Sequence, residues 1–161
     1  MTVFLYNGTA LLSAYLFMEF VAWFSHKYIM HGFLWKWHKD HHINDMKPAQ
    51  VRHEEGFVWE KNDLFFLIYA VPAMILMITG FAVQEFILVS VAIGITLYGM
   101  TYFIVHEIIY HQRLTISFLQ KNHSNYMGAV IRAHRAHHHP KNKKDFDSYG
   151  LLIFPFKHFK S

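Results

Sequence analysis

The fourteen histidines are the residues of this sequence best suited to chemistry, and ten of them repeat one spacing pattern twice. An HxxxxH pair precedes an HxxHH triplet, first in SHKYIMHG and WHKDHH and then in VHEIIYHQR and AHRAHHHP. Imidazole nitrogens suit Zn, Cu, Ni or Fe rather than Mg or Ca. Ten ligands are too many for one ion, so the duplication predicts two metal ions with about five nitrogens each. The ten candidate ligands are His26, His31, His38, His41, His42, His106, His111, His134, His137 and His138.

The two spacings make different demands on the helices that carry them. Positions i+3 and i+4 each lie within about 60° of position i on an α-helix, so HxxHH could present up to three imidazoles to one point. Positions i and i+5 diverge by roughly 140° on a regular helix. We therefore expect each HxxxxH helix to loosen, as in a π-bulge, or to end between its histidines. Gly32, directly after His31, is a candidate end.

Four histidines fall outside the repeat. His139 could replace His138 as a ligand if the helix register differs, although Pro140 indicates that the helix ends there. His123 lies in a polar run, QKNHSNY, which is typical of a loop. We expect His53 and His158 to be solvated.

Composition indicates that a membrane surrounds much of the chain. Of the 161 residues, 53% are hydrophobic and only 16% are charged, against about 25% charged in soluble domains. Three apolar stretches, about 3–24, 64–82 and 86–105, each approach the ~20 residues that cross a bilayer. Stretches at 114–118 and 151–156 are too short to span, so three spans are expected, with four as the alternative. The fold class predicted is an all-α integral membrane helical bundle, residues 1–161 forming a single domain.

Charge predicts the orientation of this bundle. All fifteen Lys and Arg lie at 27–61 or 113–160, and none precedes the first stretch or separates the second from the third. The positive-inside rule then places the N-terminus and the 83–85 loop outside and every histidine in a cytoplasmic cap. Cysteine is absent, which excludes disulfides and thiolate-bound metals. No predicted helix carries a stripe of Lys and Arg that could contact the bases of a nucleic acid, so nucleic acid is not an expected partner.

At these motifs the chain resembles the bacterial β-carotene hydroxylases, a branch of the membrane-bound fatty acid hydroxylase and sterol desaturase superfamily. The likeness runs from MEFVAWFSHKYIMHG to SYGLLIFP and includes EKNDLF, HEIIYHQR and AHRAHHHPKNKKDFDSYG. It implies a bacterial inner-membrane monooxygenase in which the ten histidines hold two non-haem iron ions. It also implies O₂ as oxidant, with two electrons per hydroxylation from a ferredoxin-type donor. The implied reaction hydroxylates carbon 3 of each β-ionone ring of β-carotene, giving β-cryptoxanthin and then zeaxanthin.

Other residues near the motifs are candidates for supporting roles. Four acids could orient imidazole N–H groups or be solvated interfacial acids: Asp40, Glu107, Asp145 and Asp147. Five aromatic residues could wall a path for a carotenoid from the lipid, or serve in an aromatic belt: Phe20, Trp23, Phe24, Tyr102 and Phe103. Zinc competes well for imidazole, so a purified sample could carry it, but zinc has no redox chemistry.

Three other functions fit the same residues. A fatty acyl or sterol hydroxylase or desaturase, or a carotenoid ketolase, would share the histidine boxes. A non-catalytic membrane metal-binding protein or transporter belongs to a different class. Only Glu19 is an acid within a predicted span, which is weak evidence for an ion path.

Overall fold

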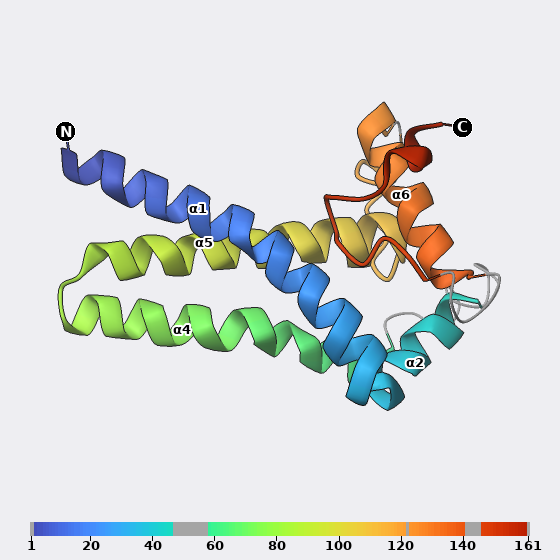
Figure 1. Ribbon diagram of the computed structural model, residues 1–161, viewed down its shortest axis with the longest axis horizontal. Coiled ribbons are helices and arrows are strands. Elements are labelled where there is room, and N and C mark those ends of the chain that lie inside the picture. The colour runs from blue at the N-terminus through green and yellow to red at the C-terminus, as the bar shows by residue number, and fades with distance from the viewer. Residues whose placement is uncertain (1, 47–57, 122, 141–145, 161) are drawn as a thin grey trace.

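The computed structural model describes residues 2–46, 58–121, 123–140 and 146–160 and is helical throughout, with no strand in these ranges. Three long helices lie side by side: α1 (Thr2–Phe24), α4 (Leu67–Ala82) and α5 (Phe86–Tyr102). Two shorter helices, α2 (Trp35–Asp45) and α6 (Asn125–His138), gather at one end of this bundle (Figure 1). The predicted all-α class is therefore confirmed.

Three helices are long and apolar enough to cross a membrane, namely Thr2–Phe33, Lys61–Ala82 and Phe86–Tyr110. Each contains one predicted span, so the described residues hold three candidate spans, as expected from the sequence. The two stretches weighed as a fourth span are not long helices, since 114–118 forms bends and a turn and 151–156 is mostly irregular. Large apolar side chains such as Phe4 and Leu16 stay exposed on the spans, as expected of surfaces that face lipid.

Helix α5 lies at the centre, packed against α1 on one side and α4 on the other. At Gly94 an added Cβ would overlap the carbonyl oxygen of Leu11, so the absence of a side chain lets α1 and α5 cross closely. Buried side chains from all three helices form the core, among them Met18, Tyr69 and Tyr98. The packing of α1 and α4 against α5 holds the ends of the three spans in fixed relative positions. The histidines that follow these ends are positioned by the same packing.

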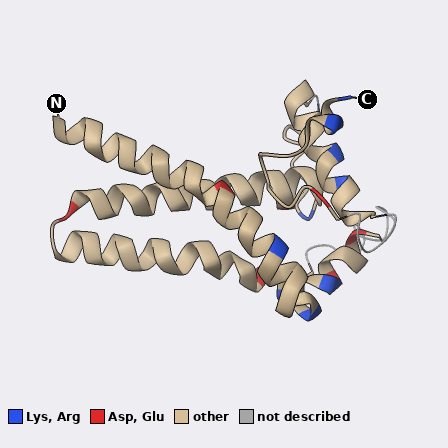
Figure 2. Cartoon of the chain, viewed as in Figure 1, with Lys and Arg blue, Asp and Glu red and all other residues tan. Residues whose placement is uncertain are grey.

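Charge divides the two ends of the bundle. In Figure 2 the lysines and arginines gather at the end that carries α2 and α6, while the N-terminus and the α4–α5 loop lie at the other end. The bundle therefore has the charge asymmetry that the sequence predicted.

His26, His31 and His106 lie on π-helix, and His111 follows directly after the end of one. The π-helical segment η1 (Ser25–Phe33) continues α1, and η3 (Phe103–Tyr110) continues α5. The N–H of His111 donates to the carbonyl of His106 at 3.0 Å, which is the i→i+5 bond of a π-helix. Gly32, with φ −95° and ψ −121°, breaks the helical path after His31. The predicted loosening is confirmed, and it turns both histidines of each pair to the same side.

Two further segments complete the histidine end. The 3₁₀ turn η2 (Lys61–Phe66) leads into α4 and contacts α2. After α6, residues 146–155, here called the C-terminal strap, run without helix beside the end of α1 before the short turn η4 (Phe156–Phe159).

Candidate metal centre

Ten histidines converge in two groups, and within each group one nitrogen of every ring lies within 4.8 Å of the others. The first cluster contains His26, His31, His38, His42 and His137. The second cluster contains His41, His106, His111, His134 and His138. Nine of the ten side chains are buried, and His31 is half-buried. These are the ten residues that the sequence pattern singled out.

The division between the clusters differs from the duplicated pattern. The two copies of the pattern lie in different halves of the chain, but His41 from α2 joins the second cluster and His137 from α6 joins the first. The expectation that one HxxHH turn serves a single point is therefore wrong. Positions i+3 and i+4 diverge by about 100° on a helix, so α2 and α6 each feed both clusters.

In the first cluster, neighbouring acceptors fix which ring nitrogen carries hydrogen. Nδ1 of His26 donates to the carbonyl of Tyr149 at 2.9 Å, and Nδ1 of His137 donates to that of Asp147 at 2.7 Å. Nδ1 of His38 donates to Oδ1 of Asn62 at 2.7 Å. A carbonyl oxygen only accepts, so hydrogen stays on Nδ1 and Nε2 keeps a lone pair directed into the cluster.

The lone pairs of His26 and His38 face one another at short range. The Nε2 atoms of His26 and His38 are 3.1 Å apart, and those of His31 and His137 are 2.9 Å apart. Two neutral acceptors at that distance repel unless a cation lies between them. Imidazole–metal bonds of about 2.1 Å place two ligands at right angles roughly 3.0 Å apart. The spacing therefore fits a metal ion at the centre of the first cluster.

The second cluster is oriented by carboxylates. Nδ1 of His41 donates to Oε2 of Glu60 at 2.9 Å, and Nδ1 of His106 donates to Oε1 of Glu107 at 2.6 Å. Asp45 accepts from Nδ1 of His111 at 3.1 Å. Carboxylates behind ligand histidines fix the tautomer and make the imidazole a better donor to metal.

Within the described chain, three Nε2 atoms of this cluster are buried without a hydrogen-bond partner, those of His41, His106 and His138. An unsatisfied buried polar atom costs about 1–3 kcal/mol. Three such atoms at one point are an arrangement that a bound cation would satisfy. Both clusters therefore fit a metal ion on the chemistry and the direction of their donors.

Burial favours the neutral form of an imidazole, which is the form that binds metal. Burial, and then the neighbouring His137, lower the pKa of His42 to about 2. Burial lowers the pKa of His137 to about 4, although its hydrogen bond to Asp147 opposes the shift. The same desolvation holds the pKa of His134 well below its ordinary value. At neutral pH these three rings therefore present lone pairs rather than charges.

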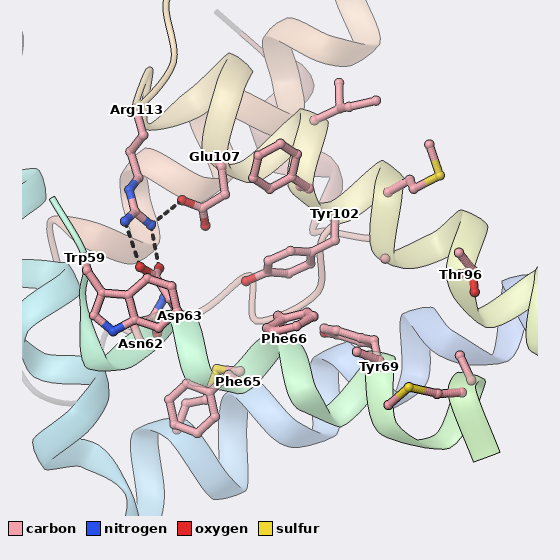
Figure 3. A pocket seen from close by; sticks show the side chains of 18 of the residues that line it. Trp59, Asn62, Asp63, Phe65, Phe66, Tyr69, Thr96, Tyr102, Glu107 and Arg113 are labelled. Atoms are coloured by element: carbon pink, nitrogen blue, oxygen red, sulfur yellow. Dashed lines mark hydrogen bonds and ion pairs between the residues drawn. The ribbon is translucent and has the colours of Figure 1, made fainter. Parts of the chain in front are cut away.

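Arg113 links the carboxylates that support the clusters. Its guanidinium donates to Asp63 at 2.5 and 2.8 Å and to Glu107 at 2.8 Å (Figure 3). Burial alone would lower the pKa of Arg113, but Asp63 and Glu107 raise it above the ordinary value. Asp63 also accepts a hydrogen bond from the backbone N–H of Glu60 at 2.9 Å. The network therefore connects Glu60, which orients His41, with Glu107, which orients His106.

An apolar groove of about 710 Å³ lies next to the supporting residues of the clusters. Side chains of α4 and α5 form its walls, and Asn62, Asp63, Glu107 and Arg113 form a polar end (Figure 3). Its lining on η2 and α4 extends from Asn62 to Ile78, about 24 Å at 1.5 Å per residue. Tyr102 lines the groove and also stacks on the ring of His106, with centroids 4.7 Å apart.

The sequence of the chain matches one family of proteins. Residues 11–156 match the model of the fatty acid hydroxylase family. The chain belongs to this family. A β-carotene hydroxylase of Paracoccus sp. (strain N81106 / MBIC 01143) is 34% identical over 150 residues, covering 92% of this chain and 85% of the relative. One from Pantoea ananas is 31% identical over 153 residues, covering 95% and 80% of the two chains.

Plant members of the family are longer. The chloroplastic β-carotene 3-hydroxylase 2 of Arabidopsis thaliana is 35% identical over 141 residues, which are 86% of this chain and 42% of the plant protein. No solved structure matches the chain. The chain is thus an enzyme of the β-carotene hydroxylase group, an oxidoreductase with histidine-rich metal sites in a bundle with three candidate membrane spans.

The four candidate acids have different positions in this hydroxylase. Glu107 orients His106, as described above. Asp147 reaches His137 through its backbone carbonyl, while its carboxylate pairs with Lys157. Asp40 is exposed on α2, and no hydrogen bond or ion pair joins it to a described histidine. Asp145 lies outside the described residues.

Three orienting residues were missed by the sequence reasoning: Asp45, Glu60 and Asn62. Glu60 and Asn62 lie in the EKNDLF stretch that carried part of the family resemblance, and this stretch was the available signal. Asp45 lies about one helical turn after the HxxHH box of α2, so helical spacing could also have placed it beside the box.

Only two of the five candidate aromatic residues line the groove. Tyr102 and Phe103 line the groove. Phe20 stacks with Trp23 and Phe24 on α1, and none of these three belongs to the groove lining. Their ring contacts and partial exposure place them on an aromatic surface of α1, outside this groove.

The remaining histidines lie outside both clusters. His139 is 49% exposed beyond the end of α6, and His123 is exposed. The expectation of a solvated His158 is wrong, because its side chain is 9% exposed and its Nε2 lies 3.3 Å from Oγ of Ser148. Packing of η4 against α6 buries it. His53 lies outside the described residues.

Proposed function

We propose that this chain is one hydroxylase domain, a membrane non-haem di-iron monooxygenase that hydroxylates carbon 3 of the β-ionone rings of β-carotene. The products would be β-cryptoxanthin and zeaxanthin. The observation that carries the proposal is the juxtaposition of two five-nitrogen clusters with a long apolar groove. The relatives named β-carotene 3-hydroxylase supply the ring position.

The histidines would act as ligands to two iron ions, one in each cluster. Iron supplies the change of oxidation state that insertion of oxygen into an unactivated C–H bond requires. The carboxylates of Glu60, Glu107 and Asp45 offset the charge of the metals and hold the imidazoles in position. Burial excludes water from the clusters, so a reactive oxidant would meet the substrate rather than solvent.

Each hydroxylation balances as a monooxygenase reaction. One C–H bond and O₂, with two electrons and two protons, give one C–O–H group and one water. A ferredoxin-type protein would donate the electrons at the basic end of the bundle. The concentration of Lys and Arg at that end supports a cytoplasmic location for the clusters, with the N-terminus outside the bacterial inner membrane.

The shape of the groove favours a long hydrocarbon as substrate. Its lining on η2 and α4 is apolar from Phe65 to Ile78, about four helical turns, and its polar end lies beside the supports of His38 and His106. A carotenoid dissolved in the bilayer could enter between these two helices and place its end ring near the clusters. A fatty acyl or sterol substrate, or ketone formation on the same ring, is the alternative within the family.

The test is expression in bacteria that accumulate β-carotene, followed by pigment analysis. Conversion to β-cryptoxanthin and zeaxanthin is expected, together with iron in the purified protein. Ketone products would indicate a ketolase, and hydroxylated acyl chains without altered pigment would indicate a fatty acyl enzyme. Unaltered β-carotene in membranes that contain the iron-loaded protein would refute the proposal.

A further inference from the structure

Glu19 is a buried acid within the first span, and the proposed function gives it no role. Its side chain is 7% exposed. An acid at that depth is unfavourable unless hydrogen bonds satisfy it. Glu19 receives three: Oε2 accepts from the hydroxyl of Tyr98 at 2.6 Å, and Oε1 accepts from the backbone N–H groups of Leu152 and Ile153, each at 2.8 Å.

Two of these donors belong to the C-terminal strap, so one carboxylate oxygen binds two consecutive peptide groups of a distant segment. The strap also fits tightly at this point. A Cβ added at Gly150 would lie 2.7 Å from Oε1 of Glu19 and from the carbonyl oxygen of Ile153. Leu151 then enters the core beside Met18 and Ala22. The strap is thus attached to α1 by the carboxylate and by apolar burial next to it.

The same strap orients ligands of the first cluster. Nδ1 of His26 donates to the carbonyl of Tyr149, and Nδ1 of His137 donates to that of Asp147. Glu19 and His26 are seven residues apart, which places them on one face about 10 Å apart along the helix. The attachment at Glu19 and the support of His26 therefore join one face of this helix to one short segment of the strap.

Among the described residues, no hydrogen bond joins the strap to a histidine of the second cluster. Its rings are oriented by Glu60, Glu107 and Asp45, which belong to η2 and its approach, η3 and α2. Loss of the strap would leave these three contacts in place. The two clusters should therefore respond differently to a change at Glu19.

We propose that Glu19 is a positioning residue for the first cluster, acting through the C-terminal strap to hold the carbonyls of Tyr149 and Asp147 against His26 and His137. This inference rests on the proposed function insofar as the cluster binds iron. The anchoring of the strap stands apart from it and is measurable without metal.

The anchoring is tested by cysteine labelling, because the chain contains no cysteine. Leu151→Cys places one thiol at a position that is 7% exposed, and its reaction with a maleimide reports release of the strap. Glu19→Leu removes both acceptor oxygens, so the labelling rate should rise about tenfold or more. Glu19→Gln keeps one oxygen for the two N–H groups and should stay near the parent rate. Tyr98→Phe, which leaves the strap contacts intact, is the matched control.

The effect on the metal is read from iron content and from the Mössbauer spectrum of the ⁵⁷Fe-loaded proteins. Glu19→Leu should lower chelator-resistant iron from about two per chain towards one and alter the signal of one site, with Glu19→Gln restoring both. Glu60→Ala should alter the other signal. Should Glu19→Leu fail to accumulate, Gly150→Ala disrupts the same contact and carries the same expectations.

Unchanged labelling in Glu19→Leu, or equal perturbation of both iron signals, would overturn the inference. Failure of the proposed function is separate and visible in the parent protein, as absence of bound iron or of pigment conversion. In that case the labelling experiment still decides whether Glu19 anchors the strap.

Discussion

His41 and His42 are adjacent in the chain, yet their rings point into different clusters, with centroids 6.3 Å apart. His137 and His138 are divided in the same way. Each cluster therefore takes four histidines from one half of the chain and one from the other. Helices α2 and α6 are shared supports, so neither metal site can form unless both helices are in place.

The crossed ligands predict crossed effects of mutation. His41→Ala should disturb the site that contains His106 and His111, although His41 lies in the first half of the chain. His137→Ala should disturb the site that contains His26 and His31. We expect the rate of carotenoid hydroxylation to fall at least about 100-fold in each variant. Loss of a metal ligand should have a larger effect than loss of the residue that accepts a hydrogen bond from that ligand. Pigment analysis and Mössbauer spectra measure the two effects.

His123→Ala serves as the control for this pair, because His123 is exposed and outside both clusters. It should retain full conversion and both iron signals. Full activity in His41→Ala or His137→Ala, with normal amounts of protein in the membrane, would contradict the ligand assignment.

The carboxylate behind His41 should matter more than the acid within the histidine box. Glu60→Ala removes the acceptor at Nδ1 of His41 and is expected to lower metal affinity or activity by about 10–100-fold. Asp40→Ala changes an exposed acid on α2 and should have little effect. Titration of the apo proteins with Fe(II) or Zn²⁺ compares the two variants. Equal affinities would show that Glu60 does not support the site.

A side chain in the groove should reduce substrate access without loss of metal. Gly99 lines the groove, and a Cβ there would make only an ordinary contact, 3.7 Å from Cβ of Tyr69. Gly99→Leu should therefore fold, and the added side chain would occupy space in the groove. We expect slower pigment conversion at unchanged iron content. Phe20→Leu, on the aromatic surface of α1, is the matched control and should convert β-carotene normally.

Close contact of α1 with α5 predicts a stability effect at Gly94. Gly94→Ala introduces a Cβ against the backbone of Leu11 and should destabilise the bundle by about 1–3 kcal/mol. Gly8→Ala meets nothing within 4 Å and should be neutral or stabilise by about 0.5–1 kcal/mol, because alanine favours helix. Unfolding of both variants in detergent gives the comparison. Equal stability of the two would mean that α1 and α5 do not cross closely.

Metal removal should weaken the whole histidine end. Without a cation, the Nε2 atoms of His26 and His38 face each other as two acceptors, and that of His106 is buried without a partner among the described residues. Chelation is therefore expected to lower the thermal midpoint, and Zn²⁺ should restore it without restoring hydroxylation. Thermal unfolding and pigment conversion, measured on the same preparations, separate the structural effect from the catalytic one.

Much of the fold was accessible from the sequence, because its signals are local. Apolar stretches of sufficient length predicted the three spans, and the distribution of Lys and Arg predicted the charged end. The spacing of His106 and His111 is incompatible with paired ligation on a regular α-helix, and π-helix is present at that point. The ten clustered histidines followed from spacing for the same reason, since helix geometry relates positions a few residues apart.

The sequence by itself thus determined the membrane class, the helical distortions and the set of histidines that meet. Only the tertiary structure decided that His41 and His137 join the cluster of the other half of the chain. Adjacent rings on a helix point about 100° apart, and they reach different clusters only because α2 and α6 each lie between the two sites. The tertiary structure also decided that Glu60, Asn62 and the carbonyl of Tyr149 orient the rings, and that a groove opens between α4 and α5. These contacts join residues far apart in the chain, so their geometry depends on how the spans pack and not on any local pattern.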